Sequence, residues 1–159
     1  MVDVPANLDL SAVRVLIVED ERVIRQLVGR MLASLGINEV TEASSAEAAW
    51  QYLAGPKSKL FDVVITDLTL PGVSGIGLIT NIRALPSVRA KTLPVVVLTG
   101  SGDPATYKKA EAAGISGYLV KPISVDLLRR TIYRALTVPL VLPANAGGQR
   151  GGFTEKAAG

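Results

Sequence analysis

The chain has 159 residues, 48% of them hydrophobic and 19% charged, a composition typical of one globular domain with a substantial core. It contains no cysteine and no histidine, which excludes disulfides, thiolate or histidine metal sites, Ser-His-Asp catalysis and a phosphohistidine on this chain. The net charge of +3 is too small a surplus to indicate direct nucleic-acid binding. With neither a signal peptide nor an apolar run of about 20 residues, we expect a cytoplasmic protein that does not insert into a membrane.

Short apolar runs alternate with helical patterns along the chain. Residues 14–18 predict the first strand, and residues 23–35 carry apolar side chains at a spacing of 3.6, with Gly36 placed as a helix C-cap. Residues 39–43 predict the second strand. Ser44 followed by Glu47 predicts a capping box that begins a second helix extending to about residue 53. Residues 61–66 predict the third strand.

The second half repeats this alternation. A turn at Pro71-Gly72 precedes a third helix over about residues 74–85, and residues 94–98 predict the fourth strand. Asp103 and Pro104 are typical of the N-cap and first position of a fourth helix, which ends at Gly114. Residues 117–120 predict the fifth strand, and Ser124 caps a fifth helix that reaches residue 136. Five such units predict an α/β fold with a doubly wound, five-stranded parallel sheet and five helices.

The two ends of the chain lack such patterns. We expect residues 1–10 to be a flexible lead and residues 11–136 to form the domain. Residues 137–159 are small, polar and rich in glycine, so we expect a flexible tail that is too short to be an output domain.

Residues suited to phosphate chemistry directly follow four of the predicted strands. They are Glu19 and Asp20, Asp67, Thr99, and Lys121. Because ligands of an open parallel sheet bind beyond the carboxyl ends of its strands, we expect these side chains to surround one crevice. Three carboxylates would repel one another unless a cation lies between them, and Mg²⁺ is the natural choice. The pattern predicts transfer of phosphate onto Asp67, although in isolation an aspartate can simply cap a strand end.

Four motifs in this order, VEDE, TDLTLPGVSG, LTGSG and YLVKP, resemble the receiver domain of two-component response regulators over about residues 13–136. The resemblance implies a flavodoxin-like, CheY-like fold with strand order 2-1-3-4-5. It also implies that Asp67 is the phosphoacceptor and that Mg²⁺ (or Mn²⁺) binds directly to Asp20 and Asp67, through water to Glu19, and to the backbone carbonyl of Thr69.

The same resemblance assigns roles to residues around the phosphate. Lys121 would contact the phosphoryl oxygens, and the Lys121–Pro122 bond would be cis. Thr99 would bind a phosphoryl oxygen after transfer, and Tyr118 would turn inward as Thr99 moves. For Tyr118, ordinary packing of a half-buried strand residue is an equally good interpretation.

The predicted function is that of a single-domain response regulator rather than an enzyme. A sensor histidine kinase or a histidine phosphotransfer protein would phosphorylate Asp67, and the chain would catalyse only its own phosphorylation and dephosphorylation. The phosphorylated protein would then bind a downstream protein through the fourth helix, fifth strand and fifth helix, where five exposed basic residues outnumber three acids. A solvated basic face is an equally good interpretation of that surplus.

Three alternatives remain open. A haloacid-dehalogenase-like phosphohydrolase also phosphorylates an aspartate but needs a second aspartate two residues later, where this chain has Thr69. A regulator that binds DNA directly would need an additional module beyond residue 136. A receiver-like binding module that never takes phosphate is the third alternative.

Overall fold

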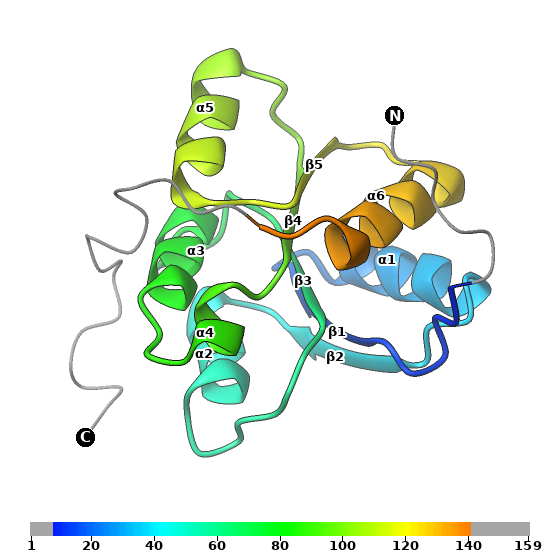
Figure 1. Cartoon of the computed structure of the whole chain (residues 1–159). Helices are drawn as coiled ribbons and strands as arrows, with labels where there is room; N and C mark the ends of the chain where they lie inside the picture. The colour runs from blue at the N-terminus through cyan, green and yellow to red at the C-terminus, as the bar shows by residue number, and fades with distance from the viewer. Residues whose placement is uncertain (1–7, 141–159) are drawn as a thin grey trace.

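The computed structural model describes residues 8–140, which form a parallel sheet covered by helices on both faces (Figure 1). The sheet has five strands in the order β2-β1-β3-β4-β5, and every neighbouring pair is parallel. This order confirms the predicted doubly wound α/β topology. The strands are β1 (Arg14–Val18), β2 (Glu39–Ala43), β3 (Val63–Thr66), β4 (Val95–Thr99) and β5 (Gly117–Val120).

The sheet divides the core into two layers, each covered by helices. The helices are α1 (Arg22–Ser34), α2 (Ala46–Leu53), α3 (Gly75–Arg83), α4 (Val88–Lys91), α5 (Pro104–Ala113) and α6 (Val125–Thr137). Figure 1 shows α1 and α6 on one face of the sheet and α2, α3 and α5 on the other. Alternate strand residues enter the two layers, as strand geometry requires: Val15 and Ile17 pack with α1 and α6, whereas Leu16 and Val18 pack with α2 and α3.

The helices differ from the prediction in two places. The single turn α4 was not expected, so the described residues contain six helices rather than five; Ser87 caps α4 by accepting a hydrogen bond from the Ala90 amide. The cap of α2 is Ser45 rather than Ser44. The predicted capping box is also wrong, because Glu47 accepts a hydrogen bond from Val73 in a different loop. Asp103 and Ser124 cap their helices as predicted.

Part of the predicted flexible lead is packed. Leu10 is buried in the layer formed with α1 and α6, and the Tyr133 hydroxyl donates a hydrogen bond to the Leu8 carbonyl at 3.2 Å. The helix α6 ends at Thr137, one residue beyond the prediction. The remaining predictions of flexibility, for residues 1–7 and 141–159, lie outside the described residues. Within residues 8–140, no helix combines the length and the apolar character needed to span a bilayer.

A buried arginine joins three segments on the face that carries α3 and α5. Arg83 is 2% exposed, and burial lowers its pKa to about 10. Its guanidinium donates to the carbonyl of Gly114 through Nε (3.0 Å) and Nη2 (2.8 Å). It also donates through Nη1 to the carbonyls of Lys91 (2.9 Å) and Leu93 (2.7 Å). One side chain thus fixes the C-terminal end of α5 against α3 and the entry to β4.

Replacing this guanidinium should destabilise the fold strongly. We expect Arg83→Met to lower the free energy of unfolding by about 2–4 kcal/mol, because it leaves buried carbonyls without donors. Urea denaturation would measure the change. Arg89→Met is the matched control: Arg89 is exposed and lies 3.9 Å from Asp62 in a weak ion pair, so its loss should change stability by no more than about 0.5 kcal/mol. Equal effects of the two substitutions would contradict this role of Arg83.

A glycine allows α3 to begin directly against the end of β3. The Gly75 amide donates to the Leu68 carbonyl at 3.0 Å, and a Cβ at this position would overlap the carbonyl oxygen of Asp67. We therefore expect Gly75→Ala to destabilise the protein by about 1–3 kcal/mol in thermal or urea unfolding. Gly29→Ala in α1 meets nothing within 4 Å, and it should instead stabilise the helix by roughly 0.5–1 kcal/mol. Loss of stability in both variants would argue against the steric explanation.

Candidate functional site

The carboxyl ends of four strands bring the predicted residues to one edge of the sheet. Val18 pairs with Thr66 in the β1–β3 register, so Glu19 and Asp67 follow on neighbouring strands. Thr99 pairs with Val120 in the β4–β5 register, which places Lys121 just beyond Thr99. The Lys121 amide continues this ladder by donating to the Thr99 carbonyl at 2.8 Å. The convergence expected from the parallel order is therefore present.

Three carboxylates meet at this edge. Glu19 and Asp67 are 3% and 7% exposed, whereas Asp20 is exposed. One carboxylate oxygen of each lies within 4.8 Å of the others. The second oxygen of Glu19, Oε2, is buried and has no hydrogen-bond partner within the described part of the chain. A buried carboxylate oxygen without a donor, together with two further oxygen ligands, suits a hard divalent cation.

Lys121 is the positive charge of the site. Its Nζ donates to Asp67 Oδ2 and to Glu19 Oε1, both at 2.8 Å. Burial alone would lower the pKa of Lys121, but the hydrogen bonds to Asp67 and Glu19 outweigh it and raise the pKa above its usual value. The lysine is therefore fully protonated at neutral pH. The Lys121–Pro122 bond is cis, as the sequence resemblance implied.

The two buried carboxylates have opposite pKa shifts. For Asp67, burial opposes ionisation, but the hydrogen bonds from Lys121 and from the Thr69 amide (3.0 Å) prevail and hold its pKa below the ordinary value. For Glu19, burial prevails over the hydrogen bond from Lys121, and the neighbouring Asp67 adds to it, so the pKa rises to about 7. Asp67 is thus anionic at neutral pH, whereas the carboxyl of Glu19, with its pKa of about 7, changes charge near neutrality.

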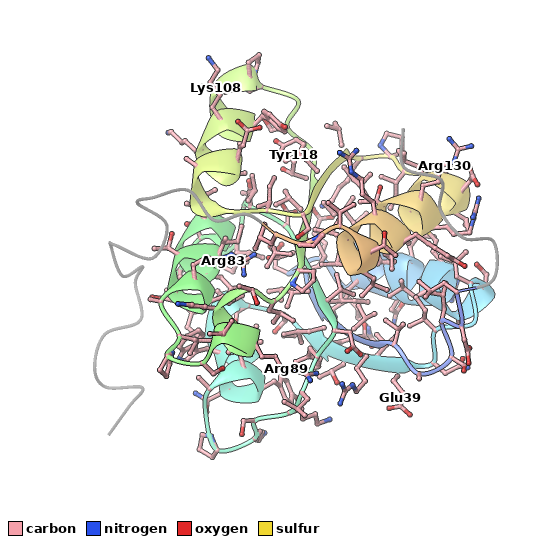
Figure 2. All side chains as sticks on the ribbon, in the orientation of Figure 1. Glu39, Arg83, Arg89, Lys108, Tyr118 and Arg130 are labelled. Atoms are coloured by element: carbon pink, nitrogen blue, oxygen red, sulfur yellow. The ribbon has the colours of Figure 1, made fainter. Side chains whose placement is uncertain are left out.

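Thr99 and Tyr118 both contact Ser101 in the loop between β4 and α5. Thr99 is 1% exposed, and its hydroxyl oxygen accepts a hydrogen bond from the Ser101 amide at 3.3 Å. The Tyr118 hydroxyl donates to the Ser101 carbonyl at 2.8 Å. The ring of Tyr118 packs edge-to-face on Tyr107, with centroids 5.1 Å apart (Figure 2 labels Tyr118). The loop residue Ser101 therefore connects the two residues of the predicted switch.

The remaining predicted residues lie as follows. Thr69 directly adjoins the site through its amide, which binds Asp67 Oδ1, while the role of its carbonyl stays a prediction. Asp62 lies at the opposite end of β3 and pairs with Arg14 at 3.1 Å, so this carboxylate lies outside the site.

Sequence reasoning missed two residues that support the site. Arg25 donates from Nη1 to the Glu19 carbonyl at 2.8 Å and lies 3.4 Å from Glu42, thereby bracing the loop that carries Glu19 and Asp20. No sequence signal marks it, because its acceptor is a backbone carbonyl. Gly75 packs against the backbone of Asp67. A glycine in the first turn of the predicted third helix was the sequence signal for this close approach.

Comparison with known proteins agrees with this geometry. The family profile described as "response regulator receiver domain" matches residues 15–133. The chain is 36% identical over 119 residues to the chemotaxis protein CheY-3 of Vibrio cholerae serotype O1, covering 75% of this chain and 88% of that protein. It is 34% identical over 119 residues to the chemotaxis protein CheY of Pseudomonas aeruginosa, covering 75% of this chain and 92% of that protein.

The solved structures agree with the sequence relatives. The crystal structure of the chemotaxis protein CheY4 of Vibrio cholerae at low pH superposes with a TM-score of 0.68 at 32% identity, covering 78% of this chain and 98% of that one. The chain thus matches receiver domains in sequence and in fold over most of the domain. It also has a lysine that binds two carboxylates at strand ends. The chain therefore belongs to the response regulator receiver domain family.

Proposed function

We propose that this protein is a signalling switch that accepts a phosphoryl group on Asp67 from a partner histidine kinase or histidine phosphotransfer protein. The observation that carries the proposal is the contact of Lys121 with Asp67 and Glu19 at 2.8 Å inside a cluster of three carboxylates. A structural ion pair would not need a third acid and a buried oxygen without a donor. A cytoplasmic location is part of this proposal.

The residues divide the work of phosphoryl transfer between them. Glu19, Asp20, Asp67 and the Thr69 carbonyl would hold Mg²⁺ (or Mn²⁺), which when bound neutralises charge on the phosphoryl oxygens. An oxygen of Asp67 forms the new bond to phosphorus as the bond to the donor's leaving group breaks. Lys121 lies beside Asp67 and would stabilise the negative charge that develops on the phosphoryl oxygens. The chain thereby catalyses only its own modification.

The response to phosphate would travel through the loop that contains Ser101. The phosphoryl group carries roughly 1.5 to 2 negative charges, which would replace the single charge of the Asp67 carboxylate beside Thr99. In this proposal, the Thr99 hydroxyl turns to a phosphoryl oxygen and leaves the Ser101 amide. The loop then moves, and the hydrogen bond from Tyr118 to the Ser101 carbonyl is lost. The described contacts support this coupling because both side chains bind the same loop residue.

The proposed output surface is formed by α5, β5 and α6, which are the predicted fourth helix, fifth strand and fifth helix. A hollow of about 470 Å³ on this face is lined by Tyr107, Tyr118 and Leu127, with Arg130 and Arg134 at its side. Figure 2 labels Lys108 on α5 and Arg130 on α6. Arg129 and Arg130 both pair with Asp126, which reduces the basic surplus. We propose a downstream protein as the partner, with no direct contact to nucleic acid and no membrane insertion.

The two main alternatives differ in measurable ways. A haloacid-dehalogenase-like phosphohydrolase needs an acid two residues after its nucleophile, and this position is Thr69. It would turn over added phosphate esters, whereas the proposed switch would not. A binding module that never takes phosphate would keep the fold but remain unmodified by any donor.

Intact-protein mass after incubation with acetyl phosphate and Mg²⁺ would test the proposal. We expect the gain of one phosphate group, which disappears in Asp67→Asn because an amide cannot form the acyl phosphate. Chelating the metal should also abolish the gain. Asp62→Asn, at the far end of β3, is the matched control and should be modified normally. A phosphate gained by Asp67→Asn would contradict the assignment of the acceptor.

Metal binding should depend on pH through Glu19. The sign follows from the pKa of about 7: below it the carboxyl carries a proton that a bound cation must displace, so affinity for Mg²⁺ should rise with pH between about 6 and 8, by at most tenfold per unit. Calorimetric titrations in buffers of different ionisation enthalpy would detect the released proton. Glu19→Gln should remove both the proton release and this pH dependence. An unchanged dependence in that variant would assign the titration to another group.

A further inference from the structure

Glu47 makes a hydrogen bond that belongs neither to the capping of α2 nor to the cluster of Glu19, Asp20 and Asp67. It lies in the first turn of α2, and its Oε1 accepts a hydrogen bond from the Val73 amide at 2.9 Å. The contact joins residues 26 positions apart and connects α2 to the loop between β3 and α3. That loop begins directly after Asp67 and carries Thr69.

The backbone of the loop is shaped to admit this carboxylate. Gly72, beside Val73, has a φ of +74°, in the left-handed region that side chains other than glycine's rarely adopt. A Cβ at Gly72 would lie 2.6 Å from Oε1 of Glu47 and would push it away. The absence of a side chain and the unusual φ thus act together, and both let Glu47 reach the Val73 amide.

The same loop is fastened at two other points close to the site. The Thr69 amide donates to Asp67 Oδ1 at 3.0 Å, and the Gly75 amide donates to the Leu68 carbonyl at 3.0 Å. Both of these hydrogen bonds lie within the segment itself, from Asp67 to Gly75. The hydrogen bond from Val73 instead fastens the segment to α2, which itself packs against α3 and β1. Leu70, between Thr69 and Val73, is buried in the core.

We infer that Glu47 is a positioning residue for the metal and phosphate site, acting through the backbone of the loop after Asp67. The inference rests on the proposed function, in which the Thr69 carbonyl is a metal ligand. A side-chain ligand can adjust by rotating, whereas a backbone carbonyl moves only with its loop. Fastening the loop in advance reduces the conformational entropy that metal binding would otherwise have to remove.

Another role for Glu47 has a different signature. An acid in the first turn of a helix also interacts favourably with the helix dipole, and this effect needs only the charge. Glu47→Gln keeps an acceptor of the same reach and loses the charge. Glu47→Asp keeps the charge and shortens the reach by one methylene. The two variants therefore separate the hydrogen bond from the electrostatic effect, and both retain a polar side chain at an exposed position.

The test is a titration of the full chain with Mg²⁺, followed by the chemical shifts of backbone amides, with the hydrogen exchange of the Val73 amide measured before metal is added. Glu47→Ala and Glu47→Asp should weaken Mg²⁺ binding about three- to tenfold, the factor expected from losing one ordinary hydrogen bond, and should speed exchange at Val73. Glu47→Gln should stay within about twofold of the parent protein. Glu39→Ala, the same change at the opposite edge of the sheet, should match the parent protein.

The outcomes distinguish failure of this inference from failure of the proposed function. A parent protein that binds no Mg²⁺ would overturn the proposed function, and this inference with it, before any variant is compared. If the parent protein binds and Glu47→Ala binds equally well, only the positioning role is overturned, even if thermal stability falls. If Glu47→Gln is as weak as Glu47→Ala while Glu47→Asp is normal, charge rather than the hydrogen bond acts, which also overturns it.

Discussion

The ammonium of Lys121, held at 2.8 Å from both Asp67 and Glu19, is the interaction on which the site depends. Burying carboxylates side by side is unfavourable, because each loses hydration and repels the other. Lys121 offsets this for two acids, but Asp20 brings a third. With all three ionised, three negative charges against one positive charge leave a formal charge of −2 at one edge of the sheet. That excess suits the site to a divalent cation, whose charge would cancel it and so allow an anionic phosphoryl group to approach.

The parallel sheet makes this arrangement possible. Each charged group lies within two residues of a strand end, so the strand ladder fixes where its backbone lies; the Lys121 amide, for instance, donates to the Thr99 carbonyl. The loops after β3 and β4 are held instead by hydrogen bonds with side chains. The first depends on Glu47 and Asp67, and the second on the two side chains that bind Ser101. In the proposed switch, the strand ends would supply the chemistry and these two loops would supply the movement.

Some local features could be predicted and others could not. The strands β1, β3 and β4 were recognised because buried parallel strands are apolar runs rich in β-branched residues. The helix starts at Asp103 and Ser124 were marked by caps and, at Asp103, by the following proline. The turn α4 was missed because one helical turn is too short to show a periodicity. The α2 cap was misplaced by one residue because Ser44 and Ser45 are both suitable, and Glu47 was assigned to the wrong partner because Val73 is distant in sequence.

The sequence by itself determined the class of fold and the edge at which Glu19, Asp20, Asp67, Thr99 and Lys121 meet, and it predicted Asp67 as the phosphoacceptor. These follow from residue type and from the alternation of strands and helices along the chain, which are local properties of the sequence. Only the tertiary structure decided which carboxylate is raised in pKa, which carbonyls Arg83 holds, and which loops Arg25 and Glu47 brace. Those features depend on burial and on hydrogen bonds between residues far apart in sequence, and neither exists until the layers have packed.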